Sequence, residues 1–144
     1  MYKSLTHTPK WLMLMESSPL DSGKPCLKHN CALCCHETRM YLTWLDISRI
    51  VKLGYSVRDF AERFGGTWRL KNVYGRCFFL DGSMCRIYRF RPYGCRLYPL
   101  IYSRDEHKIM LDDLCPHKNE FRVRAEDLRM LLGILRMLGV EIRF

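Results

Sequence analysis

The pattern of apolar and polar positions predicts two short helices in the first half of the chain. Thr43–Asp46 has the spacing of a capping box, and apolar residues follow it at helical intervals as far as Gly54. Ser56–Asp59 repeats this arrangement, so we expect a second helix with Phe64 on its inner face. Gly65–Gly66 would end that second helix, because glycine is the usual residue just beyond a helix C-terminus.

Strands are predicted where polar and apolar residues alternate. Thr67–Leu80 alternates and is rich in aromatic and β-branched residues, which indicates a hairpin with its turn near Asn72–Gly75. Leu100–Leu111 predicts another strand pair that turns at Arg104–Glu106. After these, Val140–Phe144 is short and apolar enough to return as an edge strand.

The remaining segments define the fold class. Leucines at helical spacing predict a helix over about Val123–Leu138. By contrast, two prolines and a glycine in Cys85–Pro99 exclude a long regular element there. We therefore expect an extended arm over residues 1–25 and one small α+β domain over residues 26–144. Short helices, a few antiparallel strands and irregular loops would surround a cysteine metal site in that domain.

Cysteine is the residue that changes this picture most, since the 144-residue chain contains eight. No basic head followed by an apolar stretch opens the sequence, so we expect a cytoplasmic protein whose thiols stay reduced. Clustered cysteines in such a chain are typically metal ligands or redox groups. The candidate metal ligands are Cys26, Cys31, Cys34, Cys35, Cys77, Cys85, Cys95 and Cys115.

The spacing of these cysteines leaves the metal open. The pair Cys31 and Cys34 places two thiolates on one side of a turn, which suits tetrahedral zinc or one edge of an iron–sulfur cluster. Neighbouring side chains diverge, so Cys34 and Cys35 either serve two different metals or include one reserve thiol. One or two of the eight could also be inert buried thiols. A catalytic cysteine is a further alternative, favoured by the arginines around Cys85 and Cys95.

The net charge of +9 suggests an acidic partner, and sixteen of the 24 basic residues are arginine. Arginines alternate with aromatic residues between Arg86 and Tyr98, a composition that can bind single-stranded RNA. The same residues can instead stabilise bound thiolates, and we favour this interpretation because cysteines flank the segment.

His29, His36 and His117 lie within three residues of cysteines, and we expect them to stay outside the ligand set. No segment is long and apolar enough to span a membrane.

Three blocks of this sequence carry a family resemblance, namely CALCC, CFFL and CRIYRFRPYGCRLYP. They resemble the YkgJ-type cysteine-cluster family, whose signature is CxxCxxCC and whose domain is described as chelating zinc or iron. They are also similar to the cluster region of flagellin lysine N-methylases. The resemblance implies a zinc ion or an iron–sulfur cluster, such as 4Fe–4S, as the cofactor.

We therefore expect a metal-chelating protein with a structural or accessory role, working with a protein partner or within a larger complex. One alternative is an iron–sulfur protein that assists S-adenosylmethionine-dependent methyl transfer. Another is a basic, metal-stapled module that binds RNA or a ribonucleoprotein. Cys34, Cys35, Cys85 and Cys95 should be the least replaceable cysteines because they lie in the tightest blocks, and Cys26 the most tolerant.

Overall fold

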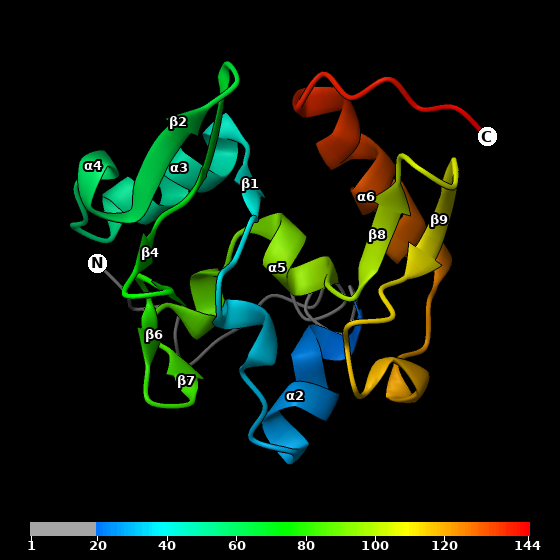
Figure 1. Cartoon of the computed structure of the whole chain (residues 1–144), viewed down its shortest axis with the longest axis horizontal. Helices are drawn as coiled ribbons and strands as arrows, with labels where there is room; N and C mark the ends of the chain where they lie inside the picture. Colours follow the sequence, from blue (N-terminus) through cyan, green and yellow to red (C-terminus); the bar gives the residue numbers. More distant parts are fainter. Residues whose placement is uncertain (1–19) are drawn as a thin grey trace, which may run out of the picture.

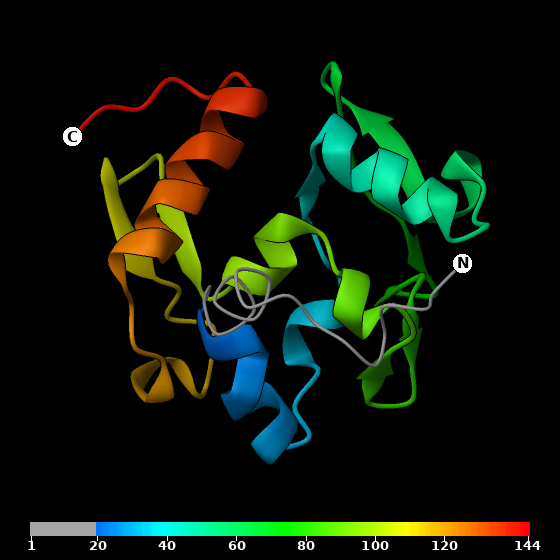
Figure 2. The same cartoon turned by 180° about the vertical axis from the view of Figure 1, so that it is seen from behind.

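The computed structural model describes residues 20–144, which form a mixed α+β domain as expected. Most of the expected arm, residues 1–19, lies outside the described residues. Within residues 20–144, no helix is long and apolar enough to cross a membrane. Two hydrophobic cores lie on either side of a short central helix, α5 (Tyr93–Leu97). Figures 1 and 2 show α5 between the two cores from both sides.

The first core is built on a three-stranded antiparallel sheet with the strand order β1-β3-β2. Its elements are β1 (Tyr41–Leu42), α3 (Trp44–Lys52), α4 (Val57–Phe60), β2 (Ala61–Phe64) and β3 (Thr67–Leu70). Two small hairpins extend it, β4 (Asn72–Val73) with β5 (Arg76–Cys77), and β6 (Leu80–Asp81) with β7 (Met84–Cys85). Phe60, Phe79 and Ile50 are almost fully buried at its centre.

Helix α3 forms as the sequence predicts. The Thr43 hydroxyl accepts from the Asp46 backbone N–H at 3.1 Å, and the Asp46 carboxylate accepts from the Thr43 N–H at 2.9 Å. These bonds complete the capping box and satisfy donors that a helix N-terminus otherwise leaves unpaired. Gly54 follows the helix with φ 107°, a conformation that glycine adopts without strain.

The second predicted helix is wrong beyond its first turn. Helix α4 ends at Phe60, and the next four residues form strand β2, which leaves Phe64 exposed. The reason lies in Gly65 and Gly66, whose φ angles of 56° and 84° suit a two-residue hairpin turn. That turn pairs β2 with β3, so the glycines connect two strands instead of ending a helix. The expected hairpin over residues 67–80 is confirmed in part: its turn lies where predicted, between β4 and β5, while residues 67–70 form β3 and pair with β1 and β2.

The second core brings the two ends of the described chain together. Its elements are the 3₁₀ helix η2 (Leu20–Gly23), α2 (Lys24–Lys28), β8 (Leu100–Ser103), β9 (Lys108–Leu111), the 3₁₀ helix η5 (Lys118–Glu120) and α6 (Ala125–Met137). The predicted strand pair and the predicted C-terminal helix are both confirmed. Leu20 is buried here, so residues 20–25 of the expected arm are helical and partly packed into the core.

The expected edge strand at Val140–Phe144 is wrong. The main chain of Arg143 is held instead by the Tyr102 hydroxyl, which accepts from its N–H at 2.8 Å and donates to its carbonyl at 2.9 Å. One side chain thereby satisfies the backbone groups that a strand ladder would have used.

The segment between the two cores contains only short helices, as the sequence predicts for Cys85–Pro99. It contains η4 (Tyr88–Phe90) and α5, while η3 (Leu33–Cys35) approaches from earlier in the chain. Helix α5 packs against α6 and η2 on one side and against β1 on the other. The cysteine-rich segments therefore meet where the two cores join.

Candidate metal centre

The eight candidate cysteines are all free thiols. They come from separate elements: Cys26 from α2, Cys34 and Cys35 from η3, Cys77 from β5, Cys85 from β7, Cys95 from α5, and Cys31 and Cys115 from loops. None of these elements is long. Each is placed by the packing of a core rather than by its own regular structure, so the thiols depend on both cores for their positions.

The thiols divide between the two cores. Cys77 is part of the first core, and three further cysteines pack against it: Cys35, Cys85 and Cys95. Cys115 is part of the second core, with Cys26 packed against it. We call Cys35, Cys77, Cys85 and Cys95 the first thiol set.

Within the first thiol set, neighbouring thiols raise one another's pKa. Burial raises the pKa of Cys77 to about 11, and the neighbouring Cys85 thiol adds to this increase. Burial also raises the pKa of Cys95 well above its usual value, with Cys77 and Cys85 contributing. The pKa of Cys35 is raised first by its hydrogen bond to Cys34 and also by Cys95 and Cys77. A raised thiol pKa means that metal binding must displace protons from this set.

The second group of thiols forms around Cys26, Cys31 and Cys115. Burial raises the pKa of Cys26 to about 11, and Cys34, Cys115 and Cys31 each add to the effect. The pKa of Cys115 is also raised by burial, with Cys34 and Cys31 among the further causes. We call Cys26, Cys31, Cys34 and Cys115 the second thiol set.

Cys34 lies at the junction of the two sets. The hydrogen bond from its neighbour Cys35 lowers the pKa of Cys34 to about 7, and the Arg91 guanidinium favours the same thiolate. Its negative charge raises the pKa of thiols in both sets, including Cys77, Cys85, Cys95 and Cys115. Cys34 is therefore the thiol most ready to be a thiolate before any metal arrives.

The thiols are gathered but not closely packed. Within residues 20–144, no three cysteine sulfurs all lie within 4.8 Å of one another. Four thiolates around one tetrahedral zinc ion are about 3.8 Å apart, given a Zn–S distance of about 2.3 Å. The donor set fits a thiolate-bound metal by its chemistry, and its spacing is wider than a single ion requires.

Two arginines supply positive charge beside these thiols. The Arg91 guanidinium lowers the pKa of thiols in both sets, and it stacks on Tyr88 at 3.9 Å from the ring centroid. Arg86 acts on Cys77 and Cys85, and it stacks on Phe78 while donating to the Phe78 carbonyl. These arginines also contact the protein's own rings and a backbone carbonyl.

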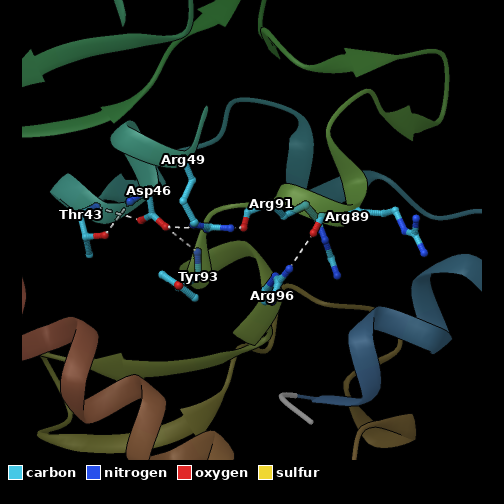
Figure 3. Close-up of polar contacts among 7 residues, drawn as sticks. All are labelled: Thr43, Asp46, Arg49, Arg89, Arg91, Tyr93 and Arg96. Atoms are coloured by element: carbon cyan, nitrogen blue, oxygen red, sulfur yellow. Dashed lines mark hydrogen bonds and ion pairs between the residues drawn. The ribbon is translucent and has the colours of Figure 1, made fainter. Parts of the chain in front are cut away.

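A buried aspartate holds the segment that carries Cys95. Figure 3 shows Asp46 accepting from the Tyr93 N–H at 3.0 Å and from Arg49 at 3.2 Å. Arg49 also donates to the carbonyl of Arg91 at 3.0 Å, and Arg96 donates to the carbonyl of Arg89 at 2.6 Å. Asp46 is completely buried, so these bonds fix α3 to the start of α5.

In the second core, a buried aspartate near the start of α6 has the same role. Asp127 is also completely buried, and its carboxylate accepts from the Arg124 N–H at 2.8 Å. Its other oxygen accepts from the Leu20 N–H at 2.7 Å. Leu20 begins the helical segment that leads to Cys26, so Asp127 anchors a cysteine-bearing segment to its core just as Asp46 does.

Gly23 allows that segment to approach Arg91. Its φ of 72° lies in the left-handed region, and a Cβ there would come within 2.6 Å of the Tyr88 hydroxyl and 3.2 Å of an Arg91 nitrogen. Only glycine fits both the conformation and the space. The close approach brings α2, and with it Cys26, beside the arginine that favours the thiolates.

Two histidines that we expected to lie outside the ligand set form a separate polar group with Glu120. His29 and His117 stack with ring centroids 3.9 Å apart and planes 3° from parallel, and both contact the Glu120 carboxylate. The available sequence signal was their place beside Cys31 and Cys115, but the sequence alone did not indicate Glu120. His36 instead contacts the Ala32 carbonyl.

A comparison with family models matches residues 25–122 to the family described as "CxxCxxCC: Putative zinc- or iron-chelating domain". The chain belongs to this family, and the expected resemblance is confirmed. No curated protein and no solved structure matches the chain significantly. The similarity to flagellin lysine N-methylases is not shown by any match and stays a prediction.

Proposed function

We propose that this domain binds metal through its cysteines in two sets of four, at the junction of its two cores. The carrying observation is the division of the thiols: Cys35, Cys77, Cys85 and Cys95 belong to the first core, and Cys26 and Cys115 to the second. Cys31 joins the second set through its effects on Cys26 and Cys115. Cys34 completes that set, because the first already has four members.

The spacing of the sulfurs favours iron–sulfur clusters over single zinc ions. In a 4Fe–4S cluster each thiolate binds a different iron atom, so the sulfurs lie farther apart than around one ion. The absence of any close cysteine triplet within residues 20–144 agrees with this wider arrangement. Arg86 and Arg91 support either metal, because they offset the negative charge of several thiolates in a confined space.

The proposed role is structural or accessory. The cysteine-bearing elements are short, and metal binding would join the two cores through them, so metal affinity would add to folding stability. Within residues 20–144, two shallow surface grooves of about 260 and 320 Å³ are lined by no cysteine. This favours a metal-stabilised module that works with a partner, in the cytoplasm, over a self-sufficient enzyme.

The test is purification of the full chain without air, followed by elemental analysis and absorption spectroscopy. We expect iron, acid-labile sulfide and the broad visible absorption of iron–sulfur clusters. Stoichiometric zinc in a colourless protein would show that the chelated metal is zinc and not an iron–sulfur cluster. Less than about half an equivalent of either metal per chain would overturn the proposal.

Sulfur-removing variants sharpen this test. Cys95→Ser should lower the metal content, because it removes a member of the first thiol set. Met84→Ser is the matched control, since Met84 is exposed and lies beside Cys85 but outside both sets. If Cys95→Ser retained as much metal as Met84→Ser, Cys95 would not be a ligand.

A further inference from the structure

The group of His29, His117 and Glu120 is the strongest feature that the proposed cysteine centre does not use. The ligand atoms of all three side chains lie within 4.8 Å of one another. The shortest separation, from His29 Nε2 to Glu120 Oε2, is 2.7 Å, and His117 Nδ1 lies 3.5 Å from the same oxygen. Two neutral imidazoles and a carboxylate are an established donor set for divalent transition metals.

We propose that His29, His117 and Glu120 form a separate binding site for one divalent transition-metal ion of the zinc type. Donor atoms around such an ion lie about 3.4 Å apart when metal–ligand distances are about 2.1 Å. Shifts of an ångström or so would therefore bring all three donors into place. The metal would replace the hydrogen bond between His29 and Glu120, and water would complete its coordination.

The backbone holds the two histidines on one side of the carboxylate. His29 lies at the C-terminal end of α2, where its N–H donates to the Pro25 carbonyl at 3.1 Å. His117 precedes η5, and Glu120, three residues later, donates its N–H to the His117 carbonyl at 3.0 Å. The two rings are nearly parallel, and a nitrogen of each faces the Glu120 carboxylate. The single turn between His117 and Glu120 keeps that carboxylate close to the His117 ring.

The site is open to solvent on one side. The His29, His117 and Glu120 side chains are 33%, 23% and 37% exposed, so an ion can enter and exchange. Glu120 also lines the groove of about 260 Å³ beside α2, which leaves space for water on the metal. Its imidazole and carboxylate donors distinguish this site from the cysteine sets, whose donors are all thiols.

Lys28 is the residue that opposes metal binding. Its ammonium group lies 3.4 Å from Glu120 Oε1, the oxygen that does not contact the histidines. A cation already beside the carboxylate lowers its attraction for a divalent ion. Removing this charge should therefore tighten binding, which is an effect opposite to that of removing a ligand.

The experiment is a titration of the full chain, purified without air together with its own thiol-bound metal, with Co²⁺ as the probe. Cobalt bound by nitrogen and oxygen gives visible d–d absorption without the near-ultraviolet thiolate charge-transfer band. We expect one additional equivalent with this signature. Glu120→Gln and His117→Ala should each weaken binding by about 10- to 100-fold, and Lys28→Met should strengthen it severalfold.

The matched control is His107→Asn, which removes an exposed imidazole from the turn between β8 and β9. Asparagine tolerates the φ of 53° at this position, so the turn should be preserved. Thermal unfolding of each variant checks that it folds. The proposal is overturned if no additional equivalent binds, if the thiolate band accompanies it, or if the His117 and His107 variants bind Co²⁺ equally well.

This inference does not depend on the proposed function, and the same experiment separates the two. A protein that lacks thiol-bound metal but binds one Co²⁺ without a thiolate band would support the histidine site and contradict the cysteine centre. A metal-loaded protein that binds no further Co²⁺ would do the reverse.

Discussion

Helices α3 and α6 hold the two cores in comparable ways. Each begins with a completely buried aspartate at its third position, Asp46 or Asp127, and each carboxylate reaches a segment that carries a cysteine. The partners differ, because Asp46 also pairs with Arg49 and through it reaches the main chain of Arg91. The first core thus fixes its cysteine segment by a charged network, while Asp127 of the second core holds the backbone N–H of Leu20.

The two thiol sets also differ in their surroundings. In the first set, Cys77 is buried in the first core and the other three cysteines pack against it. Burial is the main cause of the raised pKa of Cys77, Cys85 and Cys95. In the second set, Cys115 is buried in the second core and Cys26 packs against that core. The proposed assignment thus combines a thiol set packed against the first core with a set around Cys115 of the second core.

The largest effect is expected from Asp46→Ala. The substitution removes the cap of α3, the bond to Tyr93 and the partner of Arg49, whose Nε is already buried without a hydrogen-bond partner. Breaking such a buried pair costs about 3–5 kcal/mol of unfolding free energy. Urea unfolding of the metal-loaded protein measures this loss.

The corresponding substitution, Asp127→Ala, should cost less, about 2–3 kcal/mol, since the Asp127 carboxylate accepts from the backbone N–H groups of Arg124 and Leu20. The comparison of the two cores is contradicted if Asp127→Ala destabilises the protein more than Asp46→Ala does.

The next effect concerns the charge beside the thiols. Arg91→Met removes the guanidinium that favours thiolates in both sets, so metal affinity should fall by about 10- to 100-fold. Competition with a chelator measures the affinity. Arg91→Lys should recover part of it by restoring the charge without the planar group.

Arg89→Met is the matched control for this prediction. Arg89 is exposed, and the carbonyl that it offers to Arg96 belongs to the backbone and survives the substitution. Equal chelator sensitivity of the Arg89 and Arg91 variants would show that the Arg91 charge has no special role.

The smallest effects are expected at two glycines. Gly23→Ala places a Cβ against Tyr88 in left-handed backbone, which should cost about 1–3 kcal/mol and disturb the approach of α2 to Arg91. Gly133→Ala, in α6 with open space around the new Cβ, should instead stabilise the protein by about 0.5–1 kcal/mol. Thermal unfolding measures whether each substitution stabilises or destabilises the protein. A stabilising Gly23→Ala would argue against the close approach of Gly23 to Tyr88 and Arg91.

Local signals predicted much of this fold. The capping box at Thr43 and Asp46 involves neighbours in the chain, so it could be recognised directly, as could the leucine pattern of α6. Strand β2 was missed because its residues also suit a helix, and only the pairing with β3 across Gly65 and Gly66 decides between them. Short segments of this kind take their structure from the partner against which they pack.

The candidate site shows the same limit. Cysteine chemistry and clustering predicted the eight possible ligands, and the divergence of Cys34 from Cys35 left open whether they serve two metals or include a reserve thiol. The division into sets could not be predicted, because it depends on which core each segment joins. The Glu120 contact with His29 spans 91 residues and has no sequence signal.

The central claim is that the cysteines form two separate metal centres, and paired serine variants test it most directly. Metal content should be measured per chain for anaerobically purified wild type, Cys77→Ser from the first set and Cys115→Ser from the second. We expect each variant to lose about half of the wild-type metal and to keep the signature of the other centre. If either variant lost all of the metal, or both retained the full amount, the division into two sets of four would be contradicted.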